Sequence, residues 1–314
     1  MASILTNAAA QTALATLASI DKSIDKTSNR IASSLAVANA EDNAAYWSIA
    51  TTMRSDNNSL SAVNDALGFG AATVDVQYTA LVGAVDILAL IKEKLVAAKS
   101  VGVDRNKIQA DLTQLQRQLA LAAESASFNG QNWLSVDSSS PGHDNEKLIL
   151  SSAGRPEGAQ FSVEYITVNT DDLTLFDPKT PGPAVGILDR TRIYPDPGGD
   201  TAAVSSMTVA GLTDAPADLA RIENYVTIVD QALNDATDAA ALAGATKKRI
   251  SLQQSFLNVL RDSVDRSIAV LVETDLERDS TRLKALQTQQ QLGIQALSIA
   301  NGNASSILAF FKSP

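Results

Sequence analysis

The sequence predicts a mainly α-helical protein in which both ends of the chain form long antiparallel coiled-coil arms around a small β-rich central insert. Three observations lead to this fold class: the placement of proline, the period of the apolar residues, and the lack of charge at both tips. Eight of the nine prolines lie between Pro141 and Pro216. Proline costs about 3 kcal/mol in a helix interior, so the flanks permit long helices and the middle favours another structure.

The N-terminal arm carries an apolar stripe with the seven-residue period of a coiled-coil seam. Its first position repeats at Leu17, Ile24 and Ile31, and other apolar residues occupy the neighbouring positions. We therefore predict one helix whose packing surface consists of Leu14, Leu17, Ile20, Ile24, Ile31 and Leu35.

The C-terminal arm repeats the same period from residue 276 onward, interrupted only by Gln290. Small and polar residues fill the other positions, which suits a helix that meets protein or a wet channel rather than lipid. The predicted packing residues of this helix are Leu276, Leu283, Leu286, Ile294, Leu297, Ile307, Leu308 and Phe311.

Further helices connect the tips to the insert. We predict helices over 48–99 and 105–127, with Gly102 ending the first and Asp104 capping the second, although Gly68 and Gly70 weaken the first helix locally. A third helix runs from Leu219 to about residue 272, and 273–275 forms a joint before the last helix.

The insert has short segments rich in β-branched and aromatic residues between turn residues. Strands are predicted over 147–151, 160–168 and 206–210. Asn129-Gly130 predicts a hairpin turn near the boundary between the N-terminal arm and the insert.

These elements divide the chain into five segments. Residues 1–40 and 273–314 are predicted to form an inner helical layer, and residues 41–135 and 217–272 a second helical layer around it. Residues 136–216 form the exposed β-rich insert, which holds 12 acidic and 5 basic residues.

Composition excludes several functional classes. The chain has no cysteine and a single histidine, His143, in a predicted turn. Two-histidine metal sites are therefore excluded, and the GxGxxG, Walker A and HExxH motifs are absent. We expect no enzyme activity, no cofactor and no bound metal. The net charge of −10 and the lack of a basic patch disfavour a nucleic-acid partner.

The tips of the chain carry no charged side chain over residues 1–20 and 285–311. The second stretch would span roughly 40 Å as a helix, enough for a bilayer, but seven glutamines and asparagines would then lie in hydrocarbon. The N-terminus also lacks the pattern of a cleaved secretory signal. An isolated helix pair has little core, so we expect the tips to fold only when many copies pack together.

Both arms resemble the bacterial flagellins. The resemblance rests on the segment from Arg30 to Leu35, the segment from Asn39 through Asp42 and Asn43, the run around Asn129-Gly130, and the closing helix from residue 273. The stretch from Ala44 to Ala50 is closest to alphaproteobacterial flagellins.

This resemblance implies a structural subunit that polymerises into the flagellar filament used for swimming. It also implies export by the flagellar type III apparatus, without a cleaved signal, to the extracellular filament. The implied partners are other copies or other flagellins, together with an export chaperone and the cap and hook-junction proteins. A hook-filament junction protein of the same superfamily is the alternative, and an enzyme displayed on a filament is a remote third possibility.

The chain departs from the family pattern near residue 35. The family usually has glycine, leucine and arginine where this chain has Ser34, Leu35 and Ala36, and often an aspartate where Asn43 stands. Without the family's glycine at position 34, a hinge there is in doubt. Without its arginine at position 36, the polar contacts that the arginine makes between subunits are in doubt as well.

Overall fold

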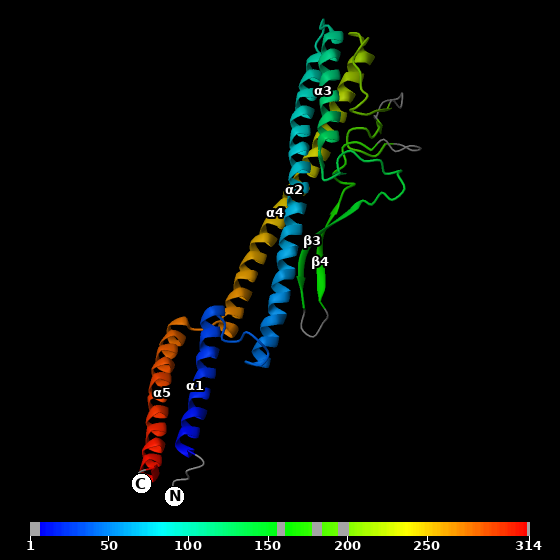
Figure 1. Cartoon of the computed structure of the whole chain (residues 1–314). Helices are drawn as coiled ribbons and strands as arrows, with labels where there is room; N and C mark the ends of the chain where they lie inside the picture. The colour runs from blue at the N-terminus through cyan, green and yellow to red at the C-terminus, as the bar shows by residue number, and fades with distance from the viewer. Residues whose placement is uncertain (1–6, 156–160, 178–183, 194–200, 313–314) are drawn as a thin grey trace. The chain divides into compact units, whose positions relative to one another are not determined.

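The computed structural model describes residues 7–155, 161–177, 184–193 and 201–312, except for the side chains of residues 193 and 303–312. It divides into two compact units. The first consists of Met1–Asn58 and Arg261–Pro314, and the second of Ser59–Leu260. Figure 1 shows the ribbon of both units.

The predicted long helices are confirmed. Helix α1 covers Ala8–Ser33, α2 covers Ala44–Ala98 and α3 covers Arg105–Ser125. Helix α4 covers Pro216–Val272, and α5 covers Leu276–Lys312. Among the described residues, α2 is the one helix long and apolar enough to cross a membrane, a test that the core helix of a soluble protein also passes.

The turn between α2 and α3 has the predicted chemistry. Gly102 adopts a left-handed backbone with φ of 79°, and the Asp104 carboxylate accepts the backbone N–H of Asn106 as an N-cap. The buried Arg105 guanidinium donates to the carbonyl of Ala98 and, at 2.7 Å, to the carboxylate of Asp214. This arginine therefore joins the turn to the segment that leads into α4, which begins with Pro216 in its first turn.

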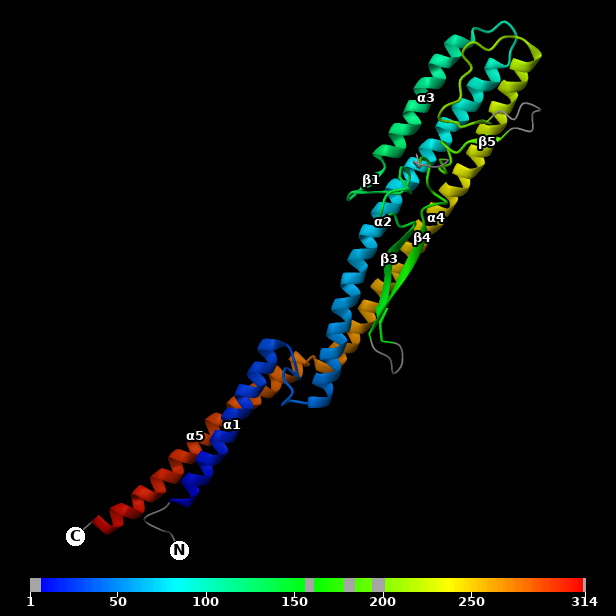
Figure 2. The ribbon, with the colours of Figure 1, turned by 90° about the vertical axis from the view of Figure 1, so that its right-hand side faces the viewer.

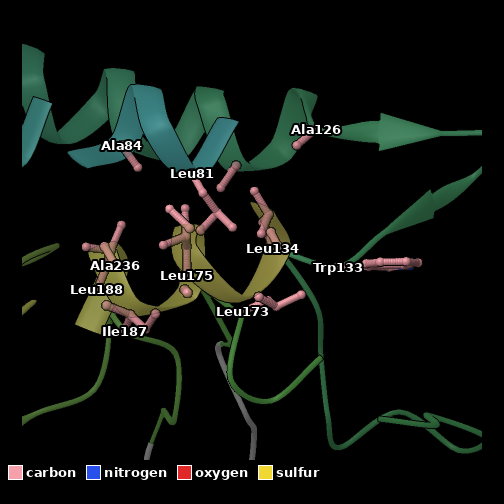
Figure 3. Packing of buried hydrophobic residues seen from close by; sticks show 14 of the residues in the cluster. Leu81, Ala84, Ala126, Trp133, Leu134, Leu173, Leu175, Ile187, Leu188 and Ala236 are labelled. Carbon is pink, nitrogen blue, oxygen red and sulfur yellow. The ribbon is translucent and has the colours of Figure 1, made fainter. Parts of the chain in front are cut away.

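The core of the second unit lies between α2, α3 and α4 and continues under the insert. Leu81 and Leu88 of α2 are completely buried, as are Leu112 of α3 and Ile222 of α4. Leu134 and several insert residues extend the same cluster, and Figure 3 shows several of them facing Leu81 and Ala84 of α2 and Ala236 of α4. They are Leu134, Leu173, Leu175, Ile187 and Leu188.

Among the described residues, three two-stranded antiparallel sheets lie between α3 and α4, one just before the insert and two within it. Strands β1 (Ser127–Phe128) and β2 (Gln131–Asn132) form the predicted hairpin, and both turn residues, Asn129 and Gly130, have positive φ. The long hairpin pairs β3 (Glu146–Gly154) with β4 (Ser162–Asn169). The third sheet pairs β5 (Arg192–Ile193) with β6 (Thr201–Ala202).

Two of the three strands predicted in the insert match β3 and β4, although Gln160 lies outside the described residues. The strand predicted over 206–210 is wrong. That segment packs as a turn against the helices, with Met207 and Val209 buried. Its backbone groups bond to helix side chains rather than to a strand, because Gln109 accepts the N–H of Val209 and Gln116 donates to the carbonyl of Met207.

The insert is also held to α4 by charge. The Asp235 carboxylate of α4 accepts a hydrogen bond of 2.6 Å from Arg190 and another of 2.6 Å from Arg192. The Arg192 side chain is buried, and it also donates to the carbonyl of Ile187. One helix carboxylate therefore anchors two insert arginines.

The glycines of α2 do not interrupt the helix, and one of them is required by packing. A β-carbon added at Gly70 would overlap Cγ2 of Ile149 on β3, whereas nothing lies within 4 Å of the same position at Gly68. Gly70 therefore lets the β3–β4 hairpin approach the backbone of α2 (Figure 2).

We predict opposite effects for alanine at these two glycines. Gly68→Ala should stabilise the second unit by about 1 kcal/mol, the helix-propensity gain. Gly70→Ala should destabilise it by about 1–3 kcal/mol, because overpacking against Ile149 outweighs that gain. Chemical denaturation followed by circular dichroism measures both, and equal effects at the two sites would contradict the packing role of Gly70.

Candidate functional site

The first unit contains an antiparallel pair formed by the two terminal helices, α1 and α5 (Figures 1 and 2). At one end of the pair, the Asn7 amide donates to the carbonyl of Ala300 at 3.0 Å, and its oxygen caps α1 by accepting the N–H of Ala10. Further along, Gln290 donates to Asp21 at 2.7 Å.

Gly293 of α5 lies close against α1. A β-carbon added there would come within 2.9 Å of Cδ2 of Leu17. Gln290, which interrupts the seven-residue repeat of α5, faces α1 and donates a hydrogen bond to Asp21. This contact explains why a polar residue stands at that position. The pair is therefore specified by one small residue and a few polar contacts as well as by its apolar stripes.

The predicted stripes lie at this contact, but they are only half-buried in one chain. On α1 the half-buried predicted residues follow the seven-residue period, and Leu35 lies just beyond the helix. The half-buried set is Leu17, Ile20, Ile24, Ile31 and Leu35 on the N-terminal side, and Leu283, Leu286 and Leu297 on α5.

Three predicted packing residues lie outside the contact. Leu14 is 60% exposed, Leu276 is 46% exposed and Ile294 is 55% exposed. Leu14 flanks the α1 stripe rather than belonging to it, since the half-buried residues there are Ala10, Ala13 and Leu17. The backbone of α5 is described through Lys312, but the side chains of Ile307, Leu308 and Phe311 are not among the described ones.

The exposed faces of the pair carry large apolar side chains without charged neighbours at the tips. Leu292 is 58% exposed and Ile299 is 66% exposed, in addition to Leu14 and Ile294. No charged side chain occurs in residues 285–311 or 1–20. A surface of this kind is unusual for a solvated helix pair and marks an interaction surface.

The segment between α1 and α2, residues 34–43, packs against the end of α4. The backbone N–H groups of Ala36 and Val37 donate to the carbonyl of Val272, and Thr274 donates to the carbonyl of Ser34. A small apolar cluster lies beneath these bonds and comprises Val37, Ala50, Ile268 and Val272. We call residues 34–43 the connecting segment.

Ser34 is the residue that turns the chain at the end of α1. It has φ of 58° and ψ of 19°, the left-handed conformation that favours glycine. The glycine usual at this position in the resembling family has been replaced, yet the backbone keeps the conformation that glycine adopts without strain. This chain therefore retains the turn at a cost in local strain.

Asp42 organises the connecting segment. Its carboxylate accepts the N–H groups of Ala38 and Asn39 at 3.2 and 3.3 Å and forms a salt bridge of 3.1 Å with Lys26 of α1. The hydrogen bond from Lys26 is the main cause that lowers the pKa of Asp42 below its ordinary value of 3.8, and the two backbone bonds add to it. Asp42 therefore ties the connecting segment to α1.

The other predicted motif residues have separate roles. Asn43 caps α2, because its side-chain oxygen accepts the N–H of Tyr46 at 3.2 Å. Asn39 is exposed and contributes backbone groups to the turn around Asp42. Arg30 is half-buried, and its Nε has no acceptor among the described residues. Asn129 and Gly130 form the β1–β2 turn in the second unit, so they are not brought together with the others.

Two features of this site escaped sequence reasoning. Lys26 is the charge partner of Asp42, 16 positions away, and no local pattern indicates that pairing. The left-handed conformation of Ser34 was signalled only by the glycine that the resembling family has there. Among the described residues, no three histidine, aspartate or glutamate side chains gather as metal ligands would.

We predict a pH-dependent effect of Asp42→Asn. A carboxylate whose folded pKa is lowered contributes stability above its unfolded pKa and loses that contribution as pH falls through the folded pKa. The variant should therefore destabilise the first unit by less than about 1 kcal/mol at neutral pH, a small value because Lys26 is 56% exposed. The difference should start to shrink as pH falls below 3.8 and should vanish below the lowered pKa of folded Asp42.

Thermal unfolding of assembled protein between neutral and acidic pH measures this effect. The neighbouring exposed carboxylate offers a matched control, and Glu41→Gln should leave the unfolding temperature unchanged throughout. An Asp42→Asn effect that persists undiminished in acid would show that charge plays no part.

We also predict that Ser34→Gly stabilises the first unit by about 1 kcal/mol, because glycine removes the left-handed strain. Ser19→Gly, at an exposed position inside α1, should instead destabilise it by about 0.5 kcal/mol. Amide hydrogen exchange of α1 in assembled protein distinguishes the two. If both variants loosen α1, the strain at Ser34 is not real.

Comparisons with known proteins agree with this arrangement. The family model described as bacterial flagellin N-terminal helical region matches residues 4–138, and the one described as bacterial flagellin C-terminal helical region matches residues 226–311. Each match contains one of the two paired terminal helices.

Whole-chain relatives give the same result. Flagellin C of Rhizobium meliloti (strain 1021) is 43% identical over 325 residues, and Flagellin A of the same strain is 39% identical over 400 residues. A flagellin of Brucella melitensis biotype 1 is 39% identical over 313 residues. Each alignment covers 99% of this chain and 100% of the relative. The chain belongs to the bacterial flagellin family.

Proposed function

We propose that this chain is the structural subunit of a bacterial flagellar filament and that it polymerises by burying the exposed faces of its terminal helix pair against other copies. One observation carries the proposal. The α1–α5 pair leaves its stripes half-buried and exposes Leu14, Leu292 and Ile299 on surfaces that lack charge.

The physical argument rests on apolar burial. Removing apolar surface from water contributes about 25 cal/mol per Å², and a pair of helices has no third element to cover its outer faces. Neighbouring copies supply that cover in a helical polymer. Polar residues of the C-terminal tip, such as Gln287 and Gln291, suit contacts between helices or a wet channel rather than lipid.

The radial layers follow from the same argument. Residues 1–40 and 273–314 form the inner layer of the filament, and residues 41–135 and 217–272 form the wall around it. The acidic insert, residues 136–216, faces the water. The packing residues for polymerisation are the apolar residues of both tips, and the contacts of Asp42 and Asn43 set the connection between the inner layer and the wall.

The proposed route and partners follow from family membership. The subunit leaves the cell through the flagellar type III apparatus without a cleaved signal and works outside the cell in the filament, where its rotation produces swimming. An export chaperone, the cap and the hook-junction proteins are its transient or terminal partners. It acts without catalysis and without a cofactor. No observation favours a hook-filament junction role.

We predict that removing residues 285–314 abolishes filament growth, because one half of the proposed inner layer is lost. Purified monomer is added to filament seeds, and elongation is followed by light scattering and electron microscopy. Filaments that still grow would overturn the buried-terminus proposal.

A single charge gives a sharper version of this test. Leu292→Glu places a carboxylate in the proposed dry contact and should raise the critical concentration for assembly by more than about tenfold, equivalent to about 1.4 kcal/mol. Leu148→Glu is the matched control, because Leu148 lies in the insert with 60% exposure against 58% for Leu292. Equal behaviour of the two variants would contradict the radial assignment.

A further inference from the structure

A groove of about 690 Å³ lies in the second unit between α2 and α3, which run side by side in both views (Figures 1 and 2). Its lining is mainly apolar. It includes Ile87 and the 46% exposed Leu90 of α2, together with Ala122 of α3. We call this surface the α2–α3 groove, and the described residues of the chain leave it open.

Gly83 of α2 lies in this groove and has no packing role within the chain. Nothing lies within 4 Å of a β-carbon added at this position. Glycine is less favourable than alanine inside a helix, so it lowers helix stability without a benefit inside one chain. A benefit arises when a side chain from outside the chain enters the groove and approaches the backbone of α2.

The groove side of the unit is acidic. Residues 59–91 of α2 hold three aspartates and no cationic side chain. Two of these aspartates, Asp75 and Asp86, line the groove. Asp75 pairs with Lys247 of α4, whereas the exposed Asp86 forms no ion pair among the described residues. The groove therefore offers an apolar surface beside an unpaired carboxylate.

A ridge of the opposite charge lies on α4. Leu252, Phe256 and Val259 are 60%, 56% and 66% exposed, and their spacing places them on one face of the helix. Lys248 and Arg249, about one turn earlier, are exposed and have no ion-pair partner in the described part of the chain. Residues 242–260 hold three cationic side chains and no acidic one. We call residues 248–259 the α4 ridge.

We propose that the α4 ridge of one copy docks into the α2–α3 groove of a second copy. The apolar side chains of the ridge cover Gly83 and Leu90, and Lys248 or Arg249 pairs with Asp86. This inference rests on the proposed function, and it names the surfaces through which the second units of neighbouring copies meet.

The complementarity of the two surfaces favours a second copy over an unrelated partner. One chain displays both an acidic apolar groove and a basic apolar ridge, and its own fold leaves both exposed. Because the two surfaces differ, the contact is head-to-tail. A head-to-tail contact that does not close into a ring generates an open helical polymer.

Cross-linking tests the contact directly, because the chain has no cysteine of its own. Thr79 lines the groove and Ser255 lies beside Phe256 on the ridge, and both are exposed. Filaments of a chain with Thr79→Cys and Ser255→Cys are treated with a short bismaleimide, and we expect a ladder of covalent oligomers. The matched control combines Ser255→Cys with Thr167→Cys in the insert and should give no ladder.

Filling the groove tests its role in assembly. Gly83→Leu should leave the monomer folded, because the space is open and leucine favours helix. It should raise the critical concentration for seeded elongation by more than about tenfold, the effect of losing a central contact. Gly68→Leu is the matched control, since that position is equally open but lies outside the groove, and it should assemble normally. Circular dichroism confirms the helix content of both.

A charge swap tests the ion pairing. Asp86→Lys alone should raise the critical concentration about threefold, as should Lys248→Glu together with Arg249→Glu. A chain with all three substitutions again has opposite charges on the two surfaces. Its critical concentration should return to within about a factor of two of the original value.

The outcomes separate this inference from the filament role. Filaments that grow normally but give no ladder overturn the docking contact and leave the filament role standing. Equal growth of Gly83→Leu and Gly68→Leu does the same, as do charge substitutions whose effects simply add. Failure of the original chain to elongate seeds would reject the proposed function, and the docking contact with it.

Discussion

A pair of helices cannot bury its own apolar surface, and the organisation of this flagellin-family chain depends on that constraint. In the described part of the pair, even the stripe at the α1–α5 contact is only half-buried. The faces beyond the contact retain large apolar residues such as Leu292 and Ile299. Burial of these faces requires other molecules, and in the proposed filament this would make the folding of the tips and the assembly of the polymer one thermodynamic process.

The connecting segment shows how the chain leaves that pair. Three backbone bonds to the residues around Val272 and the small cluster containing Val37 hold the segment in place. Asp42 adds a charged tie to Lys26, and Ser34 accepts a left-handed turn that glycine makes without strain. These are short-range contacts of modest energy, so a single substitution in this segment can alter its geometry without affecting the larger core.

The second unit is organised differently, because its core is continuous and its insert is attached by specific contacts. Leu81 of α2 meets insert residues such as Leu175, Gly70 admits the β3–β4 hairpin, and Asp235 anchors two arginines. A pocket lined by Trp133 arises from this attachment, since it lies where the hairpin approaches α2. The insert therefore contributes one wall of this concave surface.

The long helices, the joints at Gly102 and at 273–275, the Asn129-Gly130 turn and the seven-residue stripes can all be predicted from local patterns, because each depends on local backbone preferences or on helical period. The other features depend on tertiary contacts. The 206–210 segment reads as a strand, but the side chains of Gln109 and Gln116 take its backbone bonds. Leu14 fits an apolar stripe, yet the crossing of α1 and α5 leaves it exposed. The pairing of Lys26 with Asp42 and the groove between α2 and α3 depend on which elements meet in space, and that information is not present in any short stretch of the chain.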